Sequence, residues 1–426
     1  MPLKLLAVGD IHLGRRPTRL PDELLRDAAA LSPAAAWRRL VDRAIAETVD
    51  VVALAGDVVE REDDFFEAYR ELKQGVDRLV AAGISVLGVA GNHDVQVLPQ
   101  LADQLDGFQL LGRGGQWQQW SHPAQGETLT LHGWSFRQAR ETVSPLDSFP
   151  RQRGDGVNLG LLHCDRDQSG SYHAPVTSAA LNAAGMDGWL LGHIHAPDAL
   201  SCSQLSGYLG CVSGMDPGEP GDHGPWLISI EHNRVSEVSQ WVLAPLRWER
   251  ISLDISALTD PDQARDILLN QLREYDQQLA NVTQPPDAVA IRLTLTGRSE
   301  LGADTEALFK KERDSIRVDG EATGAHYYIE RVLSDTRPTI PLQQLAQRSD
   351  PPGLLARRLL SLDQPETDMA RRLIAQGRER LGTVSGESRW QSLAPPLLHD
   401  DEVIDWLRRA GTRMLDALLA QKETAE

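Results

Sequence analysis

The first half of the chain carries five short blocks of aspartate, asparagine and histidine, which are residue types that bind divalent metals. In chain order the blocks are Asp10-Ile11-His12, Gly56-Asp57, Gly91-Asn92-His93-Asp94, His163 and Gly192-His193-Ile194-His195. Mixed imidazole and oxygen donors suit manganese, iron or zinc better than calcium, and the lack of thiolates disfavours a structural zinc site. The blocks together therefore predict a metal site.

The spacing of the first block allows both of its side chains to bind one ion. Asp10 and His12 are two residues apart, so at the end of an extended strand both side chains point the same way. His193 and His195 have the same spacing, on a turn at a strand end. One such pair is weak support by itself, because a single histidine is often a structural residue.

Asp57 and Asn92 add oxygen donors of different charge. Asp57 can bridge two metals because a carboxylate has two oxygens, and Gly56 allows the turn a close approach. The alternative role of Asp57 is that of a turn former or a helix cap. Asn92 offers a neutral oxygen, which limits the negative charge where an anionic phosphate must bind. With His163 the donor set is complete, and the occurrence of all five blocks in one order favours a joint role.

The remaining histidines lack this context and are expected to be structural. They are His122, His132, His173, His223, His232, His326 and His399. His173 is also a candidate substrate contact, because it follows a loop rich in glycine and serine soon after His163.

Each block follows an apolar run that predicts a buried strand, at residues 3–8, 51–54, 85–89, 159–162 and 189–191. The carboxyl ends of such strands form the rim where open α/β sheets bind ligands. Helices are expected at residues 33–45 and 64–82. After residue 111, short alternating runs predict antiparallel strands that join or face the first sheet. The expected fold is a two-sheet α/β sandwich.

The length of 426 residues exceeds one ordinary core, and the sequence pattern changes twice. Residues 1–245 carry the metal blocks. Residues 246–337 predict a small α+β capping module, with strands at 248–255, 288–296 and 324–333 and a helix at 262–279. Residues 338–426 predict a helical C-terminal region, broken at 350–353 and 394–396. Its closing helix has an apolar stripe that either packs on its own domain or docks a partner. The stripe runs through Val403, Trp406, Leu407, Met414, Leu415 and Leu418.

The formal charge of −18 argues against a protein that coats nucleic acid through a broad basic surface. A nuclease is still compatible, because bound cations add positive charge where a phosphodiester sits. Arg15, Arg16, Arg137 and Arg140 either line a groove or lie on a solvated face.

Cysteine usage and the start of the chain bear on the compartment. Cys164, Cys202 and Cys211 lack the spacing of a zinc knuckle and are expected to be small buried residues. The sequence enters its first strand without a signal-peptide flank, and no apolar run is long enough to cross a bilayer. We therefore expect a cytoplasmic protein.

The five blocks resemble the motif series of the calcineurin-like metallophosphoesterase superfamily, which is D-x-H, G-D, G-N-H-[DE], H and G-H-x-H. Within it the chain is most similar to the SbcD-type DNA repair exonucleases, in particular their YhaO-like bacterial branch. The branch resemblance rests on residues 91–94, on residues 213–218 in place of a Pro-Gly-Ser-like turn, and on the strand at 248–255. Relatives often have Leu-Phe-Asp after the second motif, where this chain has Val58-Val59-Glu60, so the role of Glu60 stays open.

The resemblance implies a centre of two divalent ions, expected to be Mn²⁺. It assigns Asp10, His12, Asp57 and His195 to metal one, and Asp57, Asn92, His163 and His193 to metal two. It also implies that His93 is a catalytic residue facing the scissile phosphate, where it could stabilise developing charge or protonate the leaving oxygen, and that Asp94 orients it. The implied reaction is in-line attack of a metal-activated water, without a covalent intermediate.

The leading hypothesis is a two-metal phosphodiesterase that acts on DNA as a repair exonuclease. The implied partners are DNA, an SMC-like ATPase of the SbcC or YhaN type on the C-terminal helices, and a second copy in a homodimer; no membrane association is expected. The first alternative is a phosphatase or nucleotide hydrolase for small substrates. The second is a scaffold that mainly recruits an ATPase, against which the complete ligand set with His93 argues.

Overall fold

The computed structural model describes residues 2–168, 170–313, 317–385 and 399–423. They belong to two compact units, Met1–Arg337 and Pro338–Glu426. The predicted break at residues 394–396 lies outside the described residues. Among the described helices, none combines the length and the apolar character that crossing a membrane requires.

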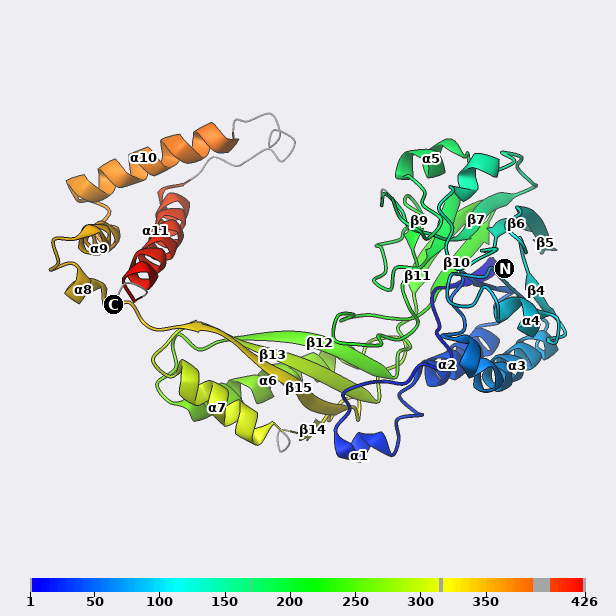
Figure 1. Ribbon diagram of the computed structural model, residues 1–426, viewed down its shortest axis with the longest axis horizontal. Helices are drawn as coiled ribbons and strands as arrows, with labels where there is room; N and C mark the ends of the chain where they lie inside the picture. Colours follow the sequence, from blue (N-terminus) through cyan, green and yellow to red (C-terminus); the bar gives the residue numbers. More distant parts are fainter. Residues whose placement is uncertain (1, 169, 314–316, 386–398, 424–426) are drawn as a thin grey trace. The chain divides into compact units, whose positions relative to one another are not determined.

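The first sheet of the larger unit has the strand order β11-β10-β1-β2-β3-β4 (Figure 1). Its strands are β1 Leu3–Val8, β2 Val51–Leu54, β3 Ser85–Gly88, β4 Phe108–Leu110, β10 Trp226–Glu231 and β11 Arg234–Gln240. β1 to β4 are parallel, whereas β10 and β11 are antiparallel additions. Leu6 and Val8 of β1 pack against helices, and Leu5 and Ala7 pack against the second sheet. Burial on both faces explains why these strands form continuous apolar runs in the sequence.

Helices cover the outer face of the first sheet. The helices of this region are α1 Asp22–Leu25, α2 Pro33–Ala46, α3 Phe65–Ala81 and α4 Leu98–Ala102. The two long helices, α2 and α3, lie where the sequence predicts them. They pack closely because Gly75 of α3 leaves room for Trp37, whose indole N–H donates to the carbonyl oxygen of Glu71 at 3.1 Å.

The second sheet has the order β5-β6-β7-β8-β9 and completes the predicted two-sheet sandwich. Its elements are β5 Gln118–Ala124, β6 Glu127–Trp134, β7 Val157–His163, α5 Ser178–Ala183, β8 Gly188–Gly192 and β9 Ser206–Tyr208. The antiparallel expectation is correct for β10 and β11 of the first sheet and for the β5–β6 pair, but β6 to β9 are parallel. The alternating pattern of β6 is typical of a half-exposed antiparallel strand, but Thr130 and His132 are buried although they are polar. They form hydrogen bonds with Asp155 and Asn158, respectively.

Residues 246–337 form the predicted α+β capping module. Its elements are β12 Leu246–Asp254, α6 Pro261–Leu279, β13 Ala288–Arg298, α7 Gly302–Glu312, β14 Arg317–Asp319 and β15 His326–Arg337. The sheet order is β12-β13-β15-β14, with the first three strands parallel. One face packs on α6 and α7, and the other contacts the segment around Leu20 and Leu31 through Trp248. An ion pair of Arg39 with Asp287 at 2.5 Å further ties the module to α2.

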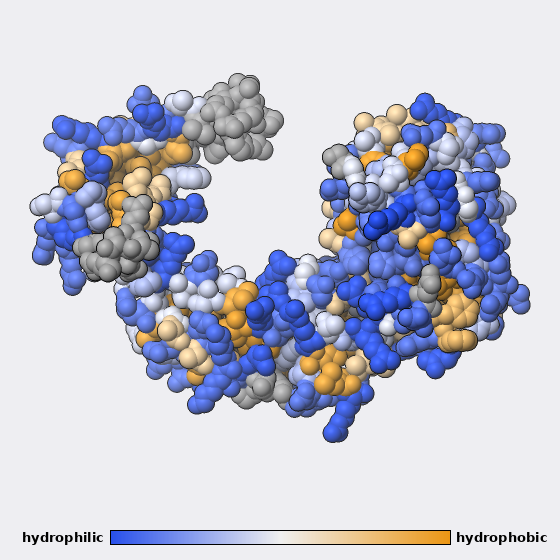
Figure 2. Space-filling view, in the orientation of Figure 1, coloured by the Kyte–Doolittle hydropathy of each residue, from blue (hydrophilic) through white to orange (hydrophobic). Residues whose placement is uncertain are grey.

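The C-terminal unit is helical, as predicted. Its helices are α8 Leu342–Leu345, α9 Pro351–Ser361, α10 Asp368–Ser385 and α11 Asp400–Glu423. The apolar stripe of α11 is divided: Val403 and Leu415 are fully buried in the core of the unit, whereas Trp406 and Met414 are 54% and 60% exposed. Figure 2 shows a hydrophobic band on the visible face of these helices. The packing interpretation of the stripe is therefore confirmed for Val403 and Leu415, and partner docking stays a prediction for the exposed residues.

Candidate metal centre

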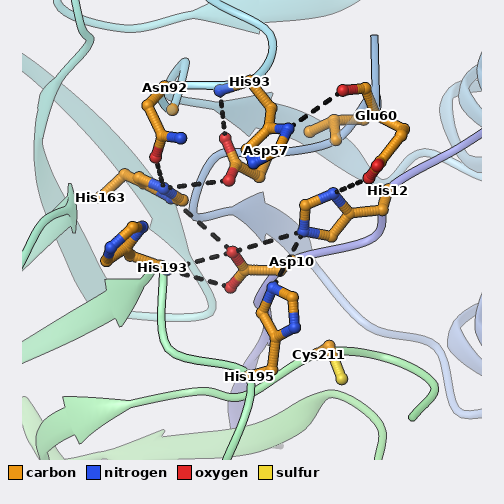
Figure 3. Close-up of polar contacts among 12 residues, drawn as sticks. Asp10, His12, Asp57, Glu60, Asn92, His93, His163, His193, His195 and Cys211 are labelled. Atoms are coloured by element: carbon orange, nitrogen blue, oxygen red, sulfur yellow. Dashed lines mark hydrogen bonds and ion pairs between the residues drawn. The ribbon is translucent and has the colours of Figure 1, made fainter. Parts of the chain in front are cut away.

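The five blocks meet at one rim of the sandwich, and both sheets contribute to it (Figure 3). Asp10, Asp57 and Asn92 follow β1, β2 and β3 of the first sheet. His163 is the last residue of β7 in the second sheet, and His193 directly follows β8. The carboxyl ends of strands from two sheets thus present their side chains to one space.

The loops that carry the ligands have left-handed backbone at three positions that are not glycine. His12 has a φ of 54°, Asp57 of 47° and His193 of 100°. The expectation of an extended strand end at Asp10 and His12 is therefore wrong, and a turn brings the two side chains together. Such strained backbone persists where surrounding contacts enforce it. Here the backbone N–H groups of Ile11 and His12 both donate to the carbonyl oxygen of Asp57.

Asp10, His12 and His195 form a first group of donors, whose ligand atoms lie within 4.8 Å of one another. Nε2 of His12 is 3.1 Å from Nε2 of His195 and 4.0 Å from Oδ1 of Asp10. Ligands at about 2.1 Å from one ion and at right angles to each other lie about 3 Å apart. The group therefore fits a single divalent cation, and it contains three of the four ligands expected for metal one.

Asp57, His163 and His193 form a second group with Asn92 beside it. Nε2 of His163 is 3.2 Å from Oδ2 of Asp57 and 3.0 Å from Oδ1 of Asn92. The other nitrogen, Nδ1, donates to the carbonyl oxygen of Ala55 at 3.0 Å, so Nε2 is the free ligand atom. The oxygens of Asp57 and Asn92 accept a proton on Nε2 or share a metal ion with it, and this mix of imidazole and oxygen donors fits metal two.

The bridging role of Asp57 stays a prediction, and the position of its carboxylate is compatible with it. Figure 3 shows its carboxylate between His163 and His12. Its Oδ1 also accepts the backbone N–H of His93 at 2.9 Å. A Cβ at Gly91 would lie 2.2 Å from this oxygen, which explains the glycine at the start of the third block.

Metal binding at the second group is expected to tighten as the pH rises towards about 9. Burial lowers the pKa of His163, but the neighbouring carboxylates of Asp57 and Asp10 outweigh it and raise the pKa to about 9. A metal must displace this proton, so each pH unit below that value should weaken binding about tenfold. Calorimetric Mn²⁺ titration at about pH 6.5, 7.5 and 8.5 measures the slope. An affinity that does not change with pH would remove His163 from the ligand set.

His93 is exposed, in contrast to the buried or half-buried ligands around it. Its Nδ1 lies 3.1 Å from the carbonyl oxygen of Glu60, which can only accept, so Nδ1 carries a proton and Nε2 is available to a substrate. The structure gives Asp94 a different role from the expected one. Its carboxylate is fully buried and accepts the backbone N–H groups of Val58 and Gly91, at 2.6 and 2.8 Å. Asp94 thus joins two ligand loops, and the Glu60 carbonyl orients the His93 ring.

Three carboxylates, to which the sequence analysis assigned no role, contact ring nitrogens of the ligand histidines. Glu60 lies 2.7 Å from Nδ1 of His12, Asp165 lies 3.2 Å from Nε2 of His193, and Glu219 lies 2.6 Å from Nδ1 of His195. Such partners orient a ligand ring and fix which nitrogen faces the metal. The signal available in the sequence was proximity to a motif, since Glu60 and Asp165 follow Asp57 and His163 by three and two residues.

The other candidates around the rim have local partners. Arg15 and Arg16 lie near Asp216 and Glu67, Arg137 pairs with Glu141, and Arg140 lies over the ring of Tyr172. The ring of His173 packs 4.8 Å from that of the ligand His193. Cys164 and Cys211 are buried as expected, but Cys202 is exposed.

Residues 3–197, which carry the five blocks, match the calcineurin-like phosphoesterase family. Residues 248–337 match the middle domain of the metallophosphoesterase YhaO. The resemblance inferred from the motifs, including the YhaO-like branch, is thereby confirmed.

Individual relatives agree with this assignment. The chain is 26% identical to the metallophosphoesterase YhaO of Bacillus subtilis over 282 residues, which cover 62% of this chain and 64% of the relative. It is 33% identical to the DNA double-strand break repair protein Mre11 of Aeropyrum pernix over 219 residues, 46% of this chain and 49% of the relative. The chain thus spans less than two thirds of the length of these relatives. Among solved structures it overlaps with the phosphoesterase YfkN of Bacillus subtilis at a TM-score of 0.36 and 12% identity, over 64% of this chain and 99% of that one.

Proposed function

We propose that the protein is a two-metal, manganese-dependent phosphodiesterase that degrades DNA from its ends, in DNA repair. The observation that carries the proposal is the pair of buried donor groups beside an exposed histidine, His93. The similarity to Mre11, a DNA double-strand break repair protein, supports DNA as the substrate.

In this proposal, three residues of the chain have separate roles beside the metal ions. When bound, two divalent ions would supply a water of lowered pKa and would neutralise phosphoryl oxygens. Asp57 would hold both ions, and Asn92 would add a ligand without adding charge, which favours approach of an anionic phosphate. His93, held at Nδ1 by the Glu60 carbonyl, would act in its doubly protonated form, donate the proton of Nε2 to the leaving oxygen and so become the neutral ring that keeps its Nδ1–H.

The substrate class is tested by hydrolysis of three substrates by the full chain with Mn²⁺. These are end-labelled DNA, bis-p-nitrophenyl phosphate and p-nitrophenyl phosphate. We expect shortening of the DNA from its ends and faster hydrolysis of the diester than of the monoester, and EDTA should abolish both activities. An Asp10→Ala variant purified in parallel controls for contaminating nucleases. A preference for the monoester, with intact DNA, would favour a phosphatase for small substrates instead.

We further propose that the exposed part of α11 docks an SMC-like ATPase. Trp406 and Met414 lie eight residues apart on this helix, and large exposed apolar side chains often mark interaction surfaces. Trp406 also borders a groove of about 580 Å³ with Leu373, Leu407 and Ala410. The homodimer implied by the family resemblance belongs to the same proposal, and sedimentation at several protein concentrations tests it.

Substitutions on the two sides of α11 are expected to have opposite effects. Leu415→Ala should lower the free energy of unfolding by about 2 to 5 kcal/mol, because Leu415 is fully buried. The double variant Trp406→Ala, Met414→Ala should change that free energy by less than about 0.5 kcal/mol per site and should lose co-purification with the ATPase. Chemical denaturation and affinity co-purification measure the two effects. A double variant that still retains the ATPase would contradict the docking role.

A further inference from the structure

Residues 213–223 connect the metal rim to the capping module. On the rim side, Oε1 of Glu219 lies 2.6 Å from Nδ1 of His195, a ligand of the first donor group. The second oxygen of Glu219 accepts the backbone N–H of Met215 at 2.7 Å. Both oxygens of one carboxylate are thus engaged, one by a metal ligand and one by the loop itself.

The opposite side of this loop is held by β12 of the capping module. The indole N–H of Trp248 donates to the carbonyl oxygen of Gly214 at 3.1 Å, and the N–H of Gly221 donates to the carbonyl oxygen of Trp248 at 3.0 Å. The guanidinium of Arg250 adds a hydrogen bond to the carbonyl oxygen of Pro217 at 3.3 Å. Trp248 is 1% exposed, so its position is set by packing in the module.

The interior of the loop leaves little room for another arrangement. A Cβ at Gly214 would lie 2.7 Å from the carbonyl oxygen of Glu219 and 3.0 Å from Cδ1 of Trp248. The buried ring of His223 contacts the same carbonyl oxygen at 3.1 Å. Backbone position at Gly214 therefore determines where the Glu219 carboxylate lies.

The charge of Glu219 suits a contact with a ligand histidine. Both of its oxygens face hydrogen-bond donors, one the ring nitrogen of His195 and the other the backbone N–H of Met215, which is the arrangement that a carboxylate satisfies. A carboxylate only accepts, so Nδ1 of His195 must carry the proton and Nε2 presents its lone pair. Nε2 is the atom that faces His12 in the first donor group.

We propose that Glu219 is a positioning residue for metal one, and that the capping module fixes it in place through Trp248. The inference rests on the proposed two-metal site. It implies that the capping module contributes to the affinity of one ion while it supplies none of that ion's ligands.

The first test is the Glu219→Gln variant of the full chain, titrated with Mn²⁺ by calorimetry. The amide cannot accept hydrogen bonds from both His195 and Met215, so one of the two sites should bind Mn²⁺ about 10- to 100-fold more weakly while the other is unchanged. Turnover of the small diester should recover at high Mn²⁺, since the loss is in metal affinity and not in chemistry. Glu237→Gln, an exposed residue on β11, is the matched control and should bind both ions like the parent.

The second test compares two tryptophans that make the same kind of hydrogen bond. Trp248→Phe removes the indole donor to Gly214, and Trp37→Phe removes an equally buried donor to the Glu71 carbonyl in α3. Both variants should lose similar stability, but only Trp248→Phe should weaken the Mn²⁺ site that Glu219→Gln weakens, by several-fold. Thermal unfolding with excess EDTA confirms that the variants are folded.

The outcomes separate the parts of the proposal. Unchanged binding of both ions in Glu219→Gln would overturn the positioning role. If Glu219→Gln weakens Mn²⁺ binding and Trp248→Phe does not, the link to the capping module would be overturned. The same holds if Trp37→Phe weakens Mn²⁺ binding as much as Trp248→Phe does. Loss of one Mn²⁺ site in Glu219→Gln, in a parent that binds two ions but leaves DNA intact, would support this inference while contradicting the proposed function.

Discussion

Replacement of His93 by alanine is expected to abolish most phosphodiester turnover while both metal ions stay bound. His93 is exposed beside two groups of buried ligands, and its Nδ1 is held by the Glu60 carbonyl, which leaves Nε2 for the leaving oxygen. Loss of a positioned general acid typically costs about 10²- to 10⁴-fold in rate. The measurement is the rate of bis-p-nitrophenyl phosphate hydrolysis together with the manganese content of the purified variant.

The metal content separates this role from ligation. A His93→Ala protein that contains far less manganese than the parent would show that the residue serves the metals. A His93→Ala variant that cleaves the diester at the parental rate would show that His93 is neither a metal ligand nor a catalytic residue. His122→Ala is the control, because His122 lies on β5, outside the donor groups.

Asp57→Asn is expected to cost more bound metal than His12→Ala. Asp57 lies between the two donor groups, with one oxygen 3.2 Å from Nε2 of His163 and the other held by the N–H of His93. An amide keeps one weak oxygen donor and loses the negative charge that both ions share, whereas loss of His12 strips a ligand from metal one alone. Activity should fall below detection in Asp57→Asn.

Elemental analysis after gel filtration measures the ratio of metal to protein in the two variants. We expect close to no tightly bound manganese in Asp57→Asn and about one ion in His12→Ala, since loss of an outer-shell partner already costs about 10- to 100-fold in metal affinity and a ligand contributes more. Retention of two ions in Asp57→Asn would remove the bridging role.

Sequence analysis recovered the donors because their signals are local. Asp10, Asp57 and Asn92 each stand one to four residues beyond a continuous apolar run, and such runs identify strands buried on both faces. Since the carboxyl ends of parallel strands share one edge, strand prediction was sufficient to bring these side chains together. The helices α2 and α3 and the capping module were predictable for the same reason, because each has a strong apolar period of its own.

Sequence patterns gave wrong predictions where polar side chains are buried or where the backbone is strained. Thr130 and His132 have the alternation of a half-exposed strand, but distant hydrogen-bond partners allow them to be buried between layers. The φ of 54° at His12 depends on hydrogen bonds from its loop to the Asp57 carbonyl, nearly fifty residues away. The division of α11 into a buried and an exposed side likewise depends on which helices pack against it.

The sequence by itself determined the types of donor atom, their order and their place at strand ends, because these are properties of short segments. The tertiary structure alone decided how closely the donors approach one another, that Asp94 joins two loops, and that Glu219 contacts His195. Those contacts join residues from different sheets and loops, and their geometry follows from how the two sheets and the capping module pack. A carboxylate such as Glu219 has no periodic or motif signal, since it acts through one partner that only folding brings within 2.6 Å.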